Sequence, residues 1–235
     1  MDRGTFSPDL AGGQGQDYIL RMIEEFGVFL AKLTARILNR EFSEAMKQIE
    51  AFYRENLALD AGLIHTFSDS ALIALLLKNG ELGAPQVLNL ARVLLLDADL
   101  TSRPDAGHED RMPIARVKYL LSFSLLMEIA LRDGQSLNAQ ARTDLDSLAV
   151  KIADWELPAT LAYKLYRYHE YKGRYGKAED ALFKLMDSGY PEVVSEGRMF
   201  YRRLSSLSDA ELLQGNLPRA ELQDGIKHFS GPEKS

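Results

Sequence analysis

Cysteine is absent from the 235-residue sequence. Its absence excludes disulfide bonds, thiolate metal sites and thiol catalysis. A chain without cysteine also suits a reducing compartment, so we predict a cytoplasmic protein.

Excess positive charge is lacking as well. The formal net charge is -6 and the pI is about 5.3. Proteins that bind nucleic acids usually carry a basic surface, so we expect no nucleic-acid partner. The most apolar stretch, residues 112–131, is interrupted by Arg116, Lys118 and Glu128. Three charges in this stretch argue against a membrane span and favour a buried central helix.

Catalytic motifs are missing too. The chain has no G-x-S-x-G, no phosphate-binding loop and no H-E-x-x-H. Asp105, His108, Glu109 and Asp110 could offer metal ligands, but their spacing matches no established site, which favours a solvated acidic loop. We therefore predict no catalytic residue, no metal site and no cofactor. The missing motifs favour a protein that is not an enzyme.

Helical periodicity is what the chain does have. Hydrophobic residues make up 46% of the sequence, enough for a sizeable core. From Asp17 to Leu213 apolar residues recur at three- and four-residue steps, and no stretch alternates like a strand. The sequence predicts an all-α fold of antiparallel helix pairs, either an α-solenoid or a helical bundle, with no sheet. It places one helical domain over 16–224 between flexible tails at 1–15 and 225–235.

The predicted helices are separated by glycine, proline and capping residues. After the first, which begins at Asp17, they cover about 41–57, 68–79, 85–100, 113–132, 138–154, 158–173, 175–187, 191–205 and 208–213. The apolar face of the first helix is broad, with Val28 and Leu38 widening it. Packing into the core is the simpler interpretation. The alternatives are that the helix lies on a membrane surface or that it pairs with a second copy to make a homodimer.

Residues 161–191 read LAYKLYRYHEYKGRYGKAEDALFKLMDSGYP and resemble a tetratricopeptide repeat. Leu165, Gly173, Tyr175 and Ala178 fall where such repeats favour a large apolar residue, a turn glycine, an aromatic and a small residue. The glycine reverses the chain, and the small residue lets two helices approach closely. The resemblance implies a local helix pair of this type.

The opening QDYILRMIEEFGVFLAKL, residues 16–33, resembles the start of an uncharacterised bacterial family of helical pairs. That resemblance would extend over most of the chain. It implies a helical fold and supplies no activity.

Half of the ten tyrosines lie between residues 163 and 175, interleaved with lysine and arginine. In the repeat register Tyr163, Arg167, Glu170 and Tyr171 fall on one face of the helix. We predict that these four residues contact a protein partner or an acidic peptide. The alternative places this face inside, covered by the 191–205 helix or by a second subunit.

The sequence thus favours a non-catalytic protein-interaction or scaffold module. A helical enzyme or small-ligand binder, with a site assembled from distant residues, is the alternative. An RNA-binding surface centred on the tyrosines is a third, weaker option.

Overall fold

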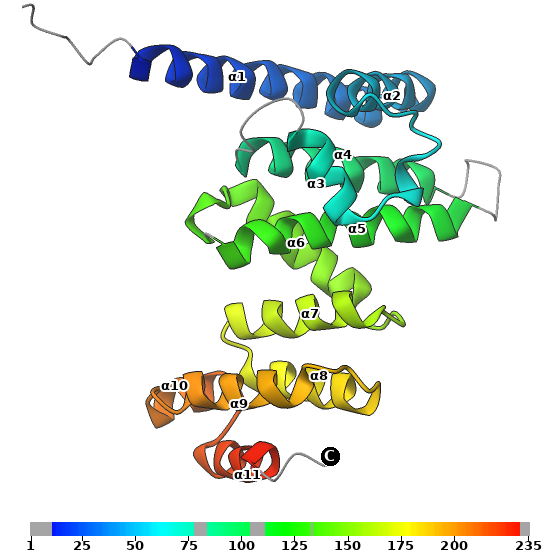
Figure 1. Ribbon diagram of the computed structural model, residues 1–235. Helices are drawn as coiled ribbons and strands as arrows, with labels where there is room; N and C mark the ends of the chain where they lie inside the picture. Colours follow the sequence, from blue (N-terminus) through cyan, green and yellow to red (C-terminus); the bar gives the residue numbers. More distant parts are fainter. Residues whose placement is uncertain (1–10, 78–83, 104–110, 133, 231–235) are drawn as a thin grey trace, which may run out of the picture. The chain divides into compact units, whose positions relative to one another are not determined.

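The protein is all-α, as predicted. The computed structural model describes residues 11–77, 84–103, 111–132 and 134–230, and within these ranges it contains eleven α-helices, two 3-10 turns and no strand (Figure 1). The α-helices are α1 (Ala11–Leu38), α2 (Phe42–Leu57), α3 (Asp69–Leu77), α4 (Ala84–Thr101), α5 (Arg111–Arg132), α6 (Ala139–Ile152), α7 (Ala159–Tyr171), α8 (Tyr175–Asp187), α9 (Val193–Leu204), α10 (Asp209–Gln214) and α11 (Arg219–Ser230).

The chain divides into two compact units, and each is described by itself. The N-terminal unit is Met1–Ala141 and the C-terminal unit is Arg142–Ser235. The predicted single domain over 16–224 stays a prediction. Helix α1 already begins at Ala11, and α11 continues beyond residue 224, where a tail was expected.

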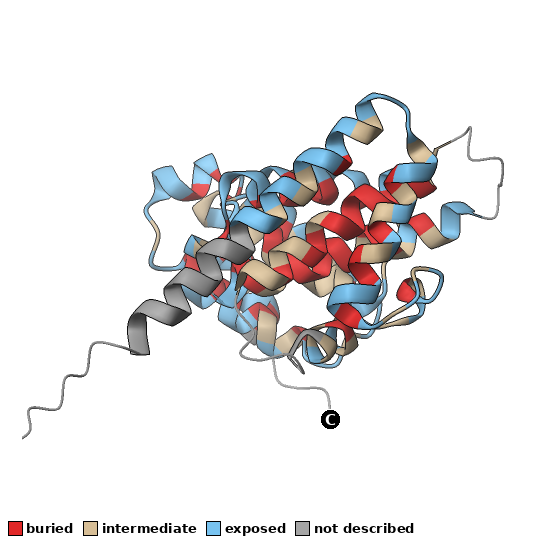
Figure 2. Cartoon of the chain, turned by 90° about the horizontal axis from the view of Figure 1, so that it is seen from above, coloured by how far each residue is buried: buried red, intermediate tan, exposed pale blue. Residues whose placement is uncertain are grey.

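Helices α4 and α5 form the centre of the N-terminal unit. Both are buried along much of their length, and the buried positions are red in Figure 2. The side chain of Lys118 on α5 is buried, and its Nζ lies 2.8 Å from Oδ1 of the fully buried Asp97 on α4. The hydroxyl of Tyr53 donates to the other carboxylate oxygen at 2.9 Å. The buried charge of α5 is therefore paired with an opposite charge, as a buried ion requires.

Helices α7 and α8 form an antiparallel pair in the C-terminal unit. Between them, Gly173 adopts a φ of +67°, a left-handed conformation that glycine adopts without steric cost. Ala178 on α8 is fully buried in a core that also contains Tyr166 of α7, Leu182 of α8 and Phe200 of α9. The turn and the small buried residue thus occur where the sequence placed them.

Helix α11 closes the C-terminal unit and was not predicted. Phe229 is buried in the core, and its ring packs against Tyr201 at 5.6 Å between centroids. Leu222 and Phe229 are seven residues apart, with Ile226 between them, which is the spacing of one helix face. The polar composition of the chain end concealed this pattern. Upstream, Ser208 caps α10 in a reciprocal capping box with Glu211, as its position suggested.

No helix in the described part of the chain is both long and apolar enough to cross a membrane. The predicted buried role of residues 112–131 agrees with the buried positions of α5.

Candidate functional site

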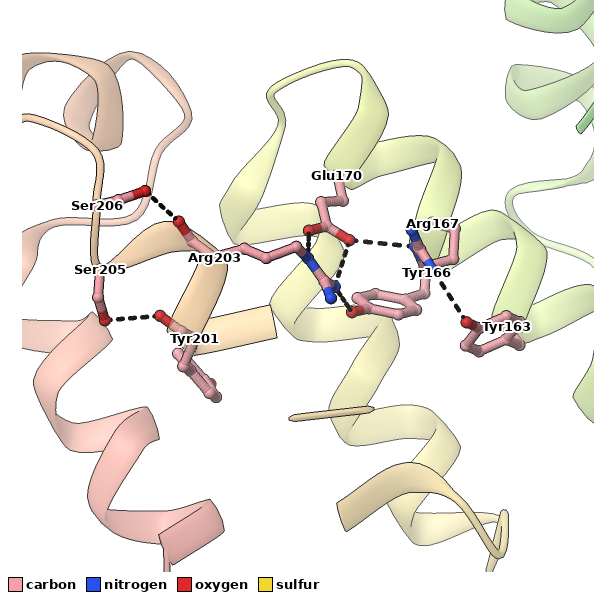
Figure 3. Close-up of polar contacts among 8 residues, drawn as sticks. All are labelled: Tyr163, Tyr166, Arg167, Glu170, Tyr201, Arg203, Ser205 and Ser206. Atoms are coloured by element: carbon pink, nitrogen blue, oxygen red, sulfur yellow. Dashed lines mark hydrogen bonds and ion pairs between the residues drawn. The ribbon is translucent and has the colours of Figure 1, made fainter. Parts of the chain in front are cut away.

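The four residues predicted to contact a partner, Tyr163, Arg167, Glu170 and Tyr171, lie on α7 and are called the α7 patch. Three of them lie together (Figure 3). Nη1 of Arg167 donates to the Tyr163 hydroxyl at 3.0 Å, and its Nε lies 3.2 Å from Oε2 of Glu170. These residues are spaced three or four apart, so they lie on the same side of the helix. Tyr171 is 39% exposed and takes no part in this group.

A residue from α9 completes this group of contacts. Nε of Arg203 donates to Oε1 of Glu170 at 2.6 Å, and Nη2 donates to Oε2 at 2.9 Å. The same Nη2 donates to the hydroxyl of Tyr166 at 3.1 Å. Two parallel hydrogen bonds of this kind hold a carboxylate firmly. Glu170 is thus shared by two guanidinium groups and ties α7 to α9.

The tyrosines around this network also pack against other rings. The ring of Tyr163 stacks on that of Tyr190, 5.8 Å away, and lies 5.7 Å from that of Tyr166. Tyr166 and Tyr168 are fully buried. Burial, and then the charge of Glu170, raise the pKa of the Tyr166 hydroxyl well above its usual range. Burial, and then Asp146, raise the pKa of Tyr168 to about 12. Both hydroxyls therefore stay neutral at physiological pH.

These contacts change what the α7 patch offers to a partner. The sequence predicts that these side chains bind a partner. In the structure the charges of Arg167 and Glu170 compensate each other within the chain. The prediction that the patch binds a partner stays a prediction. The alternative, in which α9 covers this face, agrees with the position of Arg203.

A groove on the other side of the helix pair was not predicted. It has a volume of about 430 Å³ and is formed by α7, α8 and the segment before α7. Its wall is mostly apolar, with charged groups on α8. Its lining includes Trp155, Leu165, His169, Lys177, Asp180 and Lys184. We call it the α7/α8 groove.

His169 lines the α7/α8 groove and has an unpaired polar atom. Its Nδ1 is buried and has no hydrogen-bond partner among the described residues. Burial, followed by the charges of Lys177 and Arg174, lowers the pKa of His169 to about 4. The imidazole is therefore neutral at pH 7. Sequence reasoning missed this groove, because it is formed by residues of separate segments and no local pattern indicates it.

No group of three or more histidine, aspartate or glutamate side chains in the described residues is arranged to hold a metal ion. The acidic loop with Asp105, His108, Glu109 and Asp110 lies outside the described residues. The prediction that the protein has no metal or cofactor stays a prediction.

Fold and site together define an all-α protein with a paired-helix groove in its C-terminal unit. Residues 14–232 match the model of a family of unknown function, DUF6483, and the chain belongs to that family. The predicted membership of an uncharacterised family is confirmed. No curated protein and no solved structure matches the chain.

Proposed function

We propose that this protein is a non-catalytic protein-interaction module and that the α7/α8 groove binds a partner segment with an apolar side chain flanked by carboxylates. The observation that carries the proposal is the groove itself, with its apolar wall and its lysines. Grooves of this kind accept an apolar anchor, while a few polar groups fix its orientation.

The tetratricopeptide-like character of the α7/α8 pair supports an interaction role. Each helix has 13 residues, and a short turn with Gly173 in the left-handed conformation joins them. Leu165 is buried and Ala178 is fully buried, which fits the large and small positions of that repeat. Stacked helix pairs of this class present extended binding surfaces.

The charge distribution favours an acidic partner. Residues 163–184 contain six lysines and arginines but three aspartates and glutamates, although the whole chain is acidic. Lys177 and Lys184 line the α7/α8 groove and are exposed, with Asp180 between them. Screening by salt limits charge effects to about 10 Å, so this local excess acts on a segment seated in the groove.

The α7/α8 groove is a better primary contact than the α7 patch. Glu170 in the patch already accepts hydrogen bonds from Arg203, and a partner would have to replace them. The groove offers its apolar wall and two exposed lysines, Lys177 and Lys184, without such a cost. We place the protein in the bacterial cytoplasm, because it lacks cysteine and its opening resembles a bacterial family.

Binding of synthetic peptides tests the proposal directly. The probes are fluorescein-labelled peptides with a leucine or phenylalanine between aspartates, and the same peptides with lysines in place of the aspartates. Fluorescence polarisation gives the affinity. Trp155 is the only tryptophan and lines the groove, so its emission reports occupancy. We expect the acidic peptides to bind, and to bind more weakly as salt is added.

A charge reversal locates the binding surface. The double variant Lys177→Glu, Lys184→Glu should lose affinity for the acidic peptide, while Arg202→Glu, an exposed control on α9, should retain it. Equal affinity for acidic and basic peptides, or equal loss in both variants, would show that the groove is not the site.

The second candidate function, small-ligand binding, is favoured by a different observation. A pocket in the N-terminal unit combines three phenylalanines with unpaired amide oxygens.

A further inference from the structure

A pocket of about 320 Å³ lies between α1, α2 and the beginning of α4 in the N-terminal unit. Its volume is at the lower end of the range of about 300–1,000 Å³ for small-molecule sites. Its lining includes Glu25, Phe26, Phe29, Gln48, Phe52, Glu55 and Gln86. We call it the phenylalanine pocket.

Three phenyl rings form the apolar part of this pocket. The ring centroids of Phe26 and Phe29 are 5.7 Å apart, and those of Phe29 and Phe52 are 5.3 Å apart. The third pair, Phe26 and Phe52, is separated by 6.0 Å. Such a cluster offers an aliphatic chain a large contact surface, and its ring faces attract a cation.

Two amide oxygens in the lining lack a hydrogen-bond donor. Nε2 of Gln48 donates to the carbonyl oxygen of Phe29 at 3.0 Å, which fixes the orientation of the amide and identifies Oε1 as its free end. This Oε1 is buried and has no partner among the described residues. Oε1 of Gln86 is also buried without a partner. A buried acceptor without a donor is costly, so a bound group whose N–H donors reached these oxygens would be stabilised by them.

Two carboxylates add charge to the same lining. Glu25 on α1 and Glu55 on α2 both line the pocket, and both are exposed. No lysine, arginine or histidine belongs to the described lining. The pocket therefore combines acceptors, negative charge and aromatic rings, and each of these features favours a cation.

We propose that the phenylalanine pocket binds a primary ammonium group on an aliphatic stem. The stem packs on the three rings, while the ammonium donates to Gln48, Gln86 and the carboxylate of Glu55. An ammonium has three donors and no acceptor, which matches a lining rich in acceptors. A free aliphatic amine and a lysine side chain share this chemistry.

Calorimetric titration of the full chain tests this proposal with four probes. n-Pentylamine represents the free amine, and Nα-acetyl-lysine amide represents the lysine side chain. Their neutral counterparts are n-pentanol and Nα-acetyl-norleucine amide. We expect at least one ammonium probe to bind and its neutral counterpart to bind at least about fivefold more weakly, because a charge-assisted hydrogen bond is lost. Which ammonium probe binds identifies the source.

Two variants tie the binding to the pocket. Glu55→Gln removes one charge at an exposed position, and Gln86→Leu removes one unpaired oxygen; each should weaken binding by about fivefold. The matched controls are Glu50→Gln, exposed on the same helix, and Gln223→Leu, exposed on α11. Circular dichroism establishes that each variant is folded. If Gln86→Leu fails to fold, the comparison of the ligand affinities of Glu55→Gln and Glu50→Gln still tests the proposal.

Three outcomes would overturn the proposal. The first is that neither ammonium probe binds at concentrations up to about 10 mM, beyond the millimolar end of the affinity scale. The second is that the neutral probes bind as tightly as the ammonium probes. The third is that Glu55→Gln and Glu50→Gln bind the ammonium probe with equal affinity. None of these outcomes bears on the α7/α8 groove, whose own test uses acidic peptides.

Discussion

Gly197 lies inside α9, where the ring of Phe229 from α11 packs against its backbone. A Cβ atom added at Gly197 would overlap the ring atoms Cδ1 and Cε1 of Phe229 and would lie 2.7 Å from Cγ. Gly27 lies inside α1, and a Cβ there would meet nothing within 4 Å. Replacing glycine by alanine therefore meets a steric obstacle at Gly197 and none at Gly27, although both positions lie inside a helix.

The expected signs are opposite. Alanine is favoured over glycine in a helix interior by about 1 kcal/mol, so Gly27→Ala should raise the free energy of unfolding by about that amount. At Gly197 the same gain opposes an overpacking cost of about 1–3 kcal/mol. Phe229 is 3% exposed and is held between the rings of Tyr201 and Phe183, so it cannot move aside freely. Gly197→Ala should therefore lower the free energy of unfolding by up to about 2 kcal/mol.

Urea unfolding provides the assay. Trp155 is the only tryptophan and belongs to the same unit as Gly197, so its fluorescence follows the unfolding of that unit. Circular dichroism follows the effect of Gly27→Ala. If Gly197→Ala increases stability as Gly27→Ala does, then Phe229 does not pack on α9 and the position of α11 is wrong.

Three further predictions concern buried or paired charges. Lys118→Met should lower the free energy of unfolding by about 3–5 kcal/mol, because it leaves the Asp97 carboxylate buried without its cation; urea unfolding followed by circular dichroism checks this, and a loss below about 1 kcal/mol would contradict a buried pair. Glu170→Gln should lower the free energy of unfolding by about 1–2 kcal/mol, because Arg167 and Arg203 lose the carboxylate that they share. Tryptophan fluorescence during urea unfolding measures the change, and an unchanged midpoint would mean that solvent screens these ion pairs. The pKa of His169 is lowered to about 4 in the folded state, so its contribution to stability is fully present above its unfolded value of 6.5 and is lost as the pH falls towards 4. Comparing wild type with His169→Gln at several pH values should show a smaller loss in the variant below pH 6.5, and identical curves would argue against burial of this ring.

Much of the candidate site was beyond sequence reasoning. The α7 patch was placed on one face of a helix from its spacing, and three of its members do lie together. Arg203 could not be included, because it is 33 residues from Glu170 and no local pattern links them. The α7/α8 groove and the phenylalanine pocket were missed for the same reason: each is formed by residues of separate helices.

The end of the chain illustrates a local signal that was overlooked. Leu222 and Phe229 have helical spacing, and Pro218 precedes α11 as a starting residue often does. The polar residues between Leu222 and Phe229 suggested a flexible tail. Burial of Phe229 against Tyr201 accounts for the order of this segment.

The sequence by itself determined the all-α class, the helix limits near Gly173 and Ser208, and the burial of the α5 segment. These features depend on neighbours within about four positions, through periodic burial, capping and backbone conformation. Tertiary structure alone decided that Glu170 is held by Arg203, that Lys118 is paired with Asp97, and that Gln48 is left with a free oxygen. Those outcomes depend on which helix faces which, and at what register, because hydrogen bonds and ion pairs form only within a few ångströms. The spacing of residues along the chain does not reveal the distances between side chains on different helices.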